Sequence, residues 1–453
     1  MKQTQPIIPK GAKTTFDDVW RWGQELEHLH ARIAPRFVRP EPRRRVLAYL
    51  KGIVSAIKRK NGWQLAEHAG EARPDGMQRL LNRAVWDADL VRDDLRAYIL
   101  ERLGDQEAIL VIDETSFRKR GKKSAGVKQQ YCGTTARVEN CQVGVFLSYV
   151  SSKGHTLIDR ELYLPKEWID DAERCREAGI PEETRFHTKC ELAQHMIERI
   201  FQAKIPFAWV VADTVYGGNL DLRTWLEQHG YSYVLAVACD EPVGIQTPDG
   251  RKRMTVAEAE ALMLHAEDWQ RLSMSEGTKG PRLFDWAIMP ILYGWEDDEQ
   301  HFLLIRRCLD NPSEKAYYFV FAPAGTTLVE MVKAIGQRWG IEECFETGKE
   351  MGLEDYEVRS FTSWYRHITL VMIVEACLAG ICAAARLSST KPTRDEGTCP
   401  LLPLTIPEVR HLLALLLWPP PCSQTLLLGW SWWRRCHQSR ASFFHTKRRR
   451  AAG

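Results

Sequence analysis

The first hundred residues carry apolar side chains at helical spacing. Two stretches repeat every three or four positions, with apolar residues at Trp20, Leu26, Leu29 and Ile33, and then at Val46, Leu50, Ile53 and Ile57. This period is typical of amphipathic helices, and Pro40 and Pro42 separate the two stretches. Shorter helical patterns follow at 63–69, 76–84 and 90–103. The pattern predicts an all-helical N-terminal domain at residues 1–105.

After residue 105 the pattern changes to short, β-branched apolar runs. These runs cover 108–112, 142–150, 155–164, 207–212 and 233–238, and helical stretches at 191–202 and 220–228 lie among them. A continuous apolar run of four to eight residues suits a strand that is covered on both faces. Strands that alternate with helices in this order indicate an α/β fold with a mixed sheet and flanking helices. Residues 106–239 are therefore predicted to form the first part of this core.

Residues 240–325 are rich in turns, and the chain returns to helical patterns after them. Strand-like runs at 286–292, 301–306 and 316–322 predict a β-rich insertion. Residues 326–387 are predicted to complete the core, with one long helix that starts at Thr326 or Thr327 and continues past Glu342. Residues 388–453 are predicted to be a linker, at 388–400, followed by a basic C-terminal tail.

One apolar stretch, 368–385, is long enough to cross a membrane but contains Glu375 at its centre. A central carboxylate is costly in lipid, and no second span exists in the sequence. We therefore expect a buried core helix and no membrane association.

Net charge and cysteine content indicate the kind of partner and the cellular environment to expect for this chain. The chain has 453 residues, with 62 Lys and Arg and 59 Asp and Glu, so its net charge is +3. Taken alone, this small charge argues against binding to a polyanion. The bases are clustered, however, with five among the six residues 118–123 and eight without any acid in 409–453. Twelve cysteines form no C-x-x-C pair, and the N-terminus lacks a signal peptide pattern. A reduced, cytoplasmic protein is expected.

Three carboxylates occupy positions that suit a site. Asp113 and Asp213 each end a buried strand run, at the edge where open α/β sheets place their ligands. Glu342 falls on the same helical stripe as Leu328, Met331, Ile335 and Trp339. Alternative interpretations remain for each acid: Asp113 and Asp213 suit turns or helix caps, and Glu342 suits an ion pair with Arg338 four residues earlier.

These residues resemble a known family, the bacterial insertion-sequence transposases of the DDE group. Arg338, Glu342 and Lys349 match its tyrosine-arginine-glutamate-lysine signature, with three and six residues between them. The segments 111–115 and 212–216 resemble its first and second aspartate blocks, and the resemblance covers roughly residues 15 to 450. The chain departs from the pattern at Ile335, where the signature has tyrosine, and at Thr214, where an acid is expected.

The resemblance implies an RNase H-like catalytic core and a DNA transposase. It assigns Asp113, Asp213 and Glu342 to two Mg²⁺ ions, with Mn²⁺ as a substitute, and Arg338 and Lys349 to phosphate contacts. Its partners would be double-stranded DNA, namely the terminal inverted repeats of an element and target DNA, bound by a homodimer. The N-terminal domain would serve DNA binding or assembly. Location would be cytoplasmic, and nucleoid-associated when DNA is bound.

The basic clusters are expected to contact DNA phosphates. The candidate residues are Arg118, Lys119, Arg120, Lys122, Lys123, Arg434, Arg435, Lys447, Arg448, Arg449 and Arg450. A solvated tail is an equal alternative for 447–450. Two other functions remain open: a catalytically silent, transposase-derived DNA-binding protein, and an RNase H-like nuclease without specificity for element ends.

Overall fold

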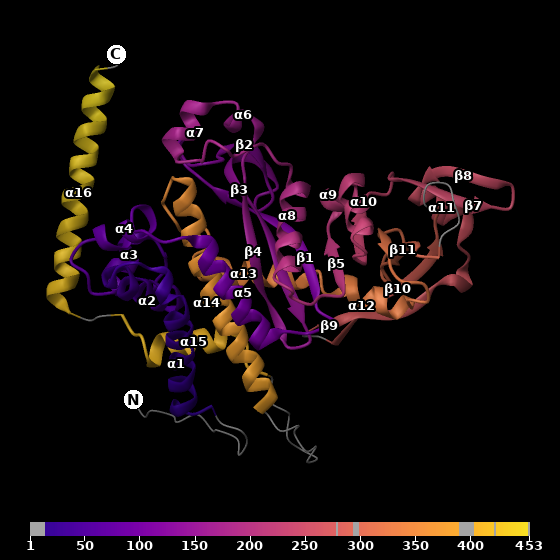
Figure 1. Ribbon diagram of the computed structural model, residues 1–453, viewed down its shortest axis with the longest axis horizontal. Helices are drawn as coiled ribbons and strands as arrows, with labels where there is room; N and C mark the ends of the chain where they lie inside the picture. The colour runs from indigo at the N-terminus through magenta and orange to yellow at the C-terminus, as the bar shows by residue number, and fades with distance from the viewer. Residues whose placement is uncertain (1–13, 278–279, 293–298, 389–402, 421–422, 452–453) are drawn as a thin grey trace. The chain divides into compact units, whose positions relative to one another are not determined.

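The computed structural model describes residues 14–277, 280–292, 299–388, 403–420 and 423–451, which form two compact units (Figure 1). The first unit comprises Met1–Tyr98, Thr347–Val358 and Arg366–Gly453, and the second comprises Ile99–Glu346 and Arg359–Tyr365. The predicted linker at 388–400 lies almost wholly outside the described residues. The units divide the chain at other positions than the predicted domain boundaries, because segments after residue 346 return to the first unit.

The first unit is helical, as the early apolar period predicted. Its helices are α1 (Phe16–Ile33), α2 (Pro40–Val54), α3 (Gly62–His68), α4 (Asp75–Asn82), most of α5 (Ala88–Leu103), most of α14 (Phe361–Ser388), α15 (Ile406–Leu416) and α16 (Gln424–Ala451). The helix ends follow local chemistry: Thr15 and Asp18 form a capping box at α1, and Asn61 accepts from two backbone N–H groups of α3. Trp20, which belongs to the apolar period of α1, is 53% exposed.

Helix α14 is the apolar stretch that raised the question of a membrane span. It is long and apolar enough to cross a membrane by length and composition, with a mean hydropathy of 2.3, but 89% of the apolar window is buried within the protein. Glu375 is also buried. This burial supports the predicted core helix, since burial on all sides explains why its apolar residues show no preferred face.

The second unit is built on one mixed sheet. Its strands are β1 (Ile109–Arg118), β2 (Lys128–Cys132), β3 (Arg137–Ser151), β4 (Gly154–Tyr163), β5 (Trp209–Ala212), β6 (Tyr233–Val237), β9 (Gln270–Gly277), β10 (Gly280–Pro290), β11 (His301–Arg307) and β12 (Lys315–Phe321). The order is β2-β3-β1-β5-β6-β12-β11-β10-β9, and β4 pairs with β3. Strands β5 and β6 run parallel to β1, whereas β3 runs antiparallel to β1 and β4 runs antiparallel to β3. The mixed sheet predicted for an RNase H-like core is confirmed.

The predicted insertion extends this sheet. Strands β10, β11 and β12 confirm the strand runs expected there, and β12 pairs with β6 from Tyr317–Val237 to Phe321–Tyr233. Strands β7 (Pro242–Thr247) and β8 (Gly250–Thr255) form a separate hairpin beside α11 (Val256–Met263). The sheet is therefore hydrogen-bonded without interruption across the predicted boundary at 239.

Helices cover both faces of the core strands. The α8 helix (Lys189–Gln202) and the first part of α13 (Trp339–Glu350) lie on opposite faces. The other helices among these segments are α6 (Lys166–Ile169), α7 (Ala172–Ala178), α9 (Thr214–Gly217), α10 (Leu220–Gln228) and α12 (Leu328–Gly336). Phe345 of α13 packs on Phe146 of β3, with ring centroids 5.5 Å apart. Phe146 pairs with Asp113 and thus shares its face of the sheet. Glu114 and its partner Val145 face the other side, which α8 covers.

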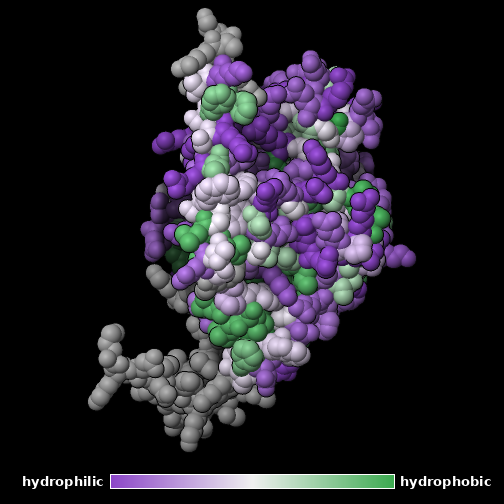
Figure 2. Space-filling view, turned by 90° about the vertical axis from the view of Figure 1, so that its left-hand side faces the viewer, coloured by the Kyte–Doolittle hydropathy of each residue, from purple (hydrophilic) through white to green (hydrophobic). Residues whose placement is uncertain are grey.

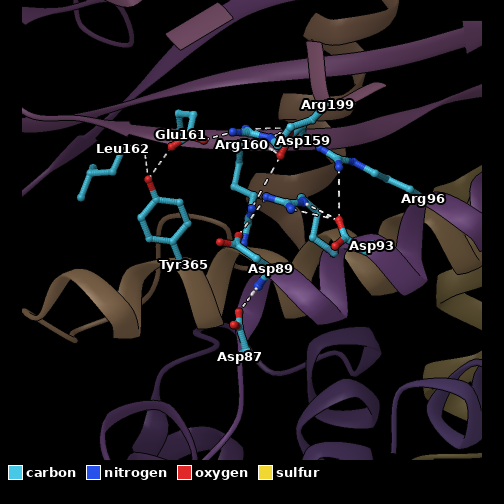
Figure 3. A network of polar contacts seen from close by, with 11 residues as sticks. Asp87, Asp89, Asp93, Arg96, Asp159, Arg160, Glu161, Leu162, Arg199 and Tyr365 are labelled. Carbon is cyan, nitrogen blue, oxygen red and sulfur yellow. Dashed lines mark hydrogen bonds and ion pairs between the residues drawn. The ribbon is translucent and has the colours of Figure 1, made fainter. Parts of the chain in front are cut away.

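A buried ion-pair network attaches α8 to β4 (Figure 3). Arg199 of α8 bonds the fully buried Asp159 at 2.8 Å and Glu161 at 2.6 Å. Tyr365, at the start of α14, donates its hydroxyl to the other oxygen of Glu161 at 2.6 Å. Paired charges of this kind are costly to break singly, because the remaining charge would stay buried. The network fixes the position of α8 on the sheet.

The single long helix predicted to begin near Thr327 is wrong, since it breaks between α12 and α13. Gly336 ends α12, and Gln337 and Arg338 donate to the carbonyls three residues earlier instead of four. A Cβ on Gly336 would lie 2.0 Å from the carbonyl oxygen of Met274, so the backbone of β9 lies directly against the break. Trp339 consequently turns outward, 41% exposed, with the Arg282 guanidinium 4.9 Å from its ring.

Gly336→Ala is expected to destabilise the protein despite the higher helix propensity of alanine. The added methyl group gains up to about 1 kcal/mol of propensity. It would also push α12 and β9 apart, and such overpacking costs roughly 1–3 kcal/mol. Urea unfolding measures the difference, and Gly133→Ala is the control because no atom lies within 4 Å of its added Cβ. Equal stability of the two variants would contradict the contact with β9.

Candidate active site

The strand register brings the two predicted aspartates together. Ile112 of β1 is paired with Ala212 of β5 in parallel register, so Asp113 and Asp213 are the next residues on each strand. Residues in register on parallel neighbours are about 4.8 Å apart across the sheet. Asp213 follows the end of β5 and begins α9, at the carboxyl end of that strand. This is the edge at which open α/β sheets place their ligands. Asp113, in contrast, neither ends its strand nor caps a helix as predicted, because β1 continues to Arg118.

Asp113 carries a strongly perturbed carboxyl group. Burial and the neighbouring charge of Asp213 raise its pKa to about 7, against a backbone hydrogen bond from Glu114 N at 2.7 Å that favours the ionised form. Arg338 is a further charge that favours ionisation. Two adjacent carboxylates in a partly desolvated place are a costly arrangement unless a cation offsets them.

Asp213 combines two roles. Its Oδ1 accepts from Val215 N at 2.9 Å and caps α9, so the interpretation as a helix cap is also correct. Burial, and then the charge of Glu114, raise its pKa, while Arg338 opposes the shift. Backbone hydrogen bonds from Val215 and Tyr216 favour the ionised form of this carboxylate and also oppose the shift.

Glu342 lies on the first turn of α13 and is tied to the same cation. Arg338 Nη2 donates to Glu342 Oε1 at 2.7 Å, with both side chains about one-third exposed. This ion pair is the alternative role expected for Glu342. The charge of Arg338 also opposes the raised pKa of Asp113 and of Asp213, so one guanidinium acts electrostatically on both aspartates and is hydrogen-bonded to Glu342. The adjacent acid Glu343 instead pairs with His155 at 3.2 Å.

The donor set suits a hard divalent cation, although the side chains are not gathered into a metal-binding cluster. Within the described residues, no three His, Cys, Asp or Glu side chains lie close enough to share a metal ion. The acids supply carboxylate oxygens alone, as Mg²⁺ prefers, and burial together with the charge of Asp213 raises the pKa of Asp113, an effect that a bound cation would oppose. Arg338 holds Glu342 in this arrangement. The assignment of the three acids to metal ions therefore stays a prediction.

Sequence reasoning missed three residues beside the aspartates. Lys189 Nζ donates to Glu114 Oε1 at 2.5 Å, and the Tyr216 hydroxyl donates to Glu114 Oε2 at 2.7 Å. Glu114 follows Asp113 directly, and Tyr216 comes three residues after Asp213. Strand alternation could have indicated that an acid next to Asp113 faces the opposite helix layer. No sequence pattern indicated Lys189, which is 75 residues away.

The basic loop after β1 is exposed and held in a defined shape. Arg118, Arg120, Lys122 and Lys123 are exposed, and Lys119 is half-buried. Asn140 Nδ2 donates to the carbonyls of Lys119 and Gly121, and Arg174 donates to that of Lys122. Lys123 pairs with Glu177 at 3.0 Å. The loop thus presents several charges to solvent from a fixed backbone.

The remaining predicted phosphate contacts lie in the helical unit. Lys349 is half-buried in the last turn of α13. In α16, Arg434 bonds Glu67 at 2.7 Å and is therefore engaged within the unit, whereas Arg435 and Lys447 are exposed. The side chains of Arg448, Arg449 and Arg450 lie outside the described residues. Figure 2, which views the side where α16 lies, shows hydrophobic residues among hydrophilic ones. Exposed hydrophobic residues of α16 are Leu427, Leu428, Trp432, Phe443 and Phe444.

Known proteins resemble this chain in sequence and in structure. A probable transposase for insertion sequence element IS701 from Microchaete diplosiphon is 28% identical over 195 residues, covering 43% of this chain and 48% of the relative. The match thus spans about half of that relative's length. Among solved structures, a piggyBac transposase synaptic complex with hairpin DNA gives a TM-score of 0.43 at 11% identity, covering 95% of this chain and 79% of that chain. The NurA nuclease from Sulfolobus solfataricus gives 0.23 at 9% identity, covering 52% and 74%.

The family comparison covers the first two acids of the site. The model of the DDE superfamily endonucleases matches residues 32–281, which include β1, β5 and both aspartates and end before Glu342. That span is more than half of the 453 residues. The chain belongs to the DDE superfamily of endonucleases.

Proposed function

We propose that this endonuclease is a DNA transposase that cleaves DNA at the ends of a mobile element and joins them to target DNA. The observation that carries the proposal is the in-register pair Asp113 and Asp213, both with raised pKa, with Glu342 linked to them through Arg338. The relative described as a probable transposase for an insertion sequence element supports the same reaction.

The acids give the site its chemistry. Endonucleases of this superfamily generally use divalent metal ions, and here Asp113, Asp213 and Glu342 would hold Mg²⁺, with Mn²⁺ as a substitute. Two such ions, when bound, stabilise the attacking and the leaving oxygen of a phosphodiester displacement. Arg338 has five N–H donors, of which Glu342 takes one, so its guanidinium is suited to hold a phosphate oxygen as well.

The partners follow from the same chemistry. Double-stranded DNA is the proposed substrate, as the terminal inverted repeats of an element and as target DNA. Pairing two element ends requires two active sites, so we propose a homodimer in the DNA complex. A cytoplasmic location, on the nucleoid when DNA is bound, suits a substrate in the bacterial chromosome.

A catalytically silent DNA-binding protein is not favoured. The chain keeps all three acids. Ile335, which replaces the signature tyrosine, is 3% exposed at the end of α12 and packs in the core. An isoleucine there fills apolar space and removes none of the three carboxylates.

Glu342→Gln is expected to abolish Mg²⁺-dependent cleavage of element-end DNA, because the amide keeps the size of the side chain and loses its charge. Glu343→Gln is the matched control, since this neighbouring acid pairs with His155 instead of Arg338. A gel assay on labelled duplexes with the element's terminal repeat, and on duplexes without it, measures the cut strands. Cleavage by Glu342→Gln at the wild-type rate would contradict the proposal. Equal cleavage of both duplexes would identify a nuclease without end specificity.

Arg120→Ala is expected to weaken DNA binding uniformly across sequences. An exposed base that contacts one phosphate contributes about one unit to the slope of log affinity against log salt. Arg434→Ala is the control, because Glu67 already engages this guanidinium. Fluorescence anisotropy at several salt concentrations gives the slopes. The prediction is wrong if Arg120→Ala keeps the wild-type slope.

A further inference from the structure

A third carboxylate lies beside the aspartate pair and is fully engaged by hydrogen bonds. Glu114 is the residue after Asp113, and its charge acts on both Asp113 and Asp213. Lys189 holds Oε1 at 2.5 Å, and Tyr216 holds Oε2 at 2.7 Å. Both oxygens are thus directed at α8 and α9 on one side of the sheet.

Each partner of Glu114 sits on an element that is itself fixed. Lys189 opens α8, directly after the Thr188 cap, and Arg199 attaches the other end of that helix to β4. Helix N-termini favour negative charge, so Glu114 also gains from the position of α8. The orientation of the Glu114 carboxylate is therefore fixed by its hydrogen bonds to α8 and α9.

Tyr216 links Glu114 to Asp213, because it lies in the short helix that Asp213 caps. The tyrosine is fully buried in α9, the four-residue helix that Asp213 caps. A Cβ on Gly217 would lie 1.8 Å from the carbonyl oxygen of Ala236, so α9 lies directly against β6. This contact limits the approach of α9 to β6, and the hydroxyl bond to Glu114 ties α9 to β1. Asp213 caps α9 through its Oδ1, so the position of its carboxylate depends on that of α9, which Tyr216 fixes.

We propose that Glu114 and Tyr216 are positioning residues that hold Asp213 next to Asp113 for a divalent cation. The inference rests on the proposed function, since it concerns the same carboxylates. Partners of this kind, which orient the direct ligands of a metal, typically contribute 10–100-fold to metal affinity or activity. Lys189 offsets the charge of Glu114 so that the three carboxylates can lie together.

Tyr216→Phe tests the positioning role, because it removes one hydroxyl and keeps the ring. The matched control is Tyr233→Phe: Tyr233 is likewise buried and donates to a carboxylate, Glu227, at 2.6 Å, but lies at the start of β6. Mn²⁺ binding to the full chain is measured by the loss of the free Mn²⁺ signal in electron paramagnetic resonance. The Mg²⁺ concentration for half-maximal cleavage and the rate at saturating Mg²⁺ are measured in parallel.

We expect Tyr216→Phe to weaken Mn²⁺ binding about 10-fold or more and to raise the half-maximal Mg²⁺ concentration more than it lowers the saturated rate. Tyr233→Phe should bind Mn²⁺ as the wild type does. If Tyr216→Phe fails to fold, Glu114→Gln replaces it, since the amide oxygen can accept from only one of the two partners well. Binding within twofold of the wild type by the folded variant would overturn the inference. If Asp213→Asn also binds Mn²⁺ like the wild type, the proposed metal site itself is wrong.

Discussion

Asp213→Asn is expected to lower the rate of Mg²⁺-dependent DNA cleavage about 10³-fold or more, because several kcal/mol of metal-ion stabilisation are lost at 1.36 kcal/mol per tenfold. This substitution is expected to change the charge of residue 213 without disturbing the local backbone. Asn accepts from the Val215 N–H as well as Asp does, so the cap of α9 is retained. The charge alone is removed. DNA affinity, measured by anisotropy without divalent ions, should stay at the wild-type value.

The matched control for this substitution is Asp221→Asn. Asp221 is exposed in the first turn of α10, close in sequence to Asp213, and outside the carboxylate group. It should cleave as the wild type does. If Asp213→Asn retained more than about a tenth of the wild-type rate with its melting temperature unchanged, a metal-ligand role, which is worth several kcal/mol, could not stand.

The position of the aspartates could be predicted from sequence because it depends on local patterns. The apolar runs before Asp113 and Asp213 specify two buried parallel strands, whose register places the two acids side by side. The prediction that Asp113 ends its strand is wrong, because β1 continues to Arg118 in the antiparallel ladder with β3. The Arg338–Glu342 pair was also predictable, because four residues of helix bring these side chains together whether or not the helix began earlier.

The rest of the site depends on contacts between distant segments. Helical spacing placed Trp339 on the buried stripe, but the break at Gly336 is imposed by the backbone of β9 at Met274. The engagement of Glu114 depends on Lys189, which a separate helix brings to it. Likewise, β12 joins β6 although the β7–β8 hairpin, α11 and the three strands β9, β10 and β11 intervene in sequence. Such pairings are decided by the packing of the whole sheet, and no local period contains them.

Asp113→Asn is expected to stabilise the folded protein at neutral pH in the absence of divalent ions. Burial and Asp213 raise the pKa of Asp113 to about 7, from about 3.9 in an unfolded chain. Between these values the folded state holds more protons than the unfolded state, so the charge of Asp113 destabilises the wild-type fold increasingly as pH rises, and this destabilisation is complete above about 7. Asn has no such charge. The variant should therefore gain roughly 1–3 kcal/mol at pH 8 and nothing below pH 4.

Thermal melts at pH 4, 6 and 8 in chelator test this dependence, with Asp105→Asn as a control of opposite sign. Hydrogen bonds from Ser152 and the backbone lower the pKa of Asp105, so its ionised form stabilises the fold above the ordinary pKa and the variant should melt lower at pH 8. Added Mg²⁺ should reduce the gain of Asp113→Asn, because an ion bound by the wild type stabilises its folded state. A gain independent of pH would mean that the charge of Asp113 is not what destabilises the site.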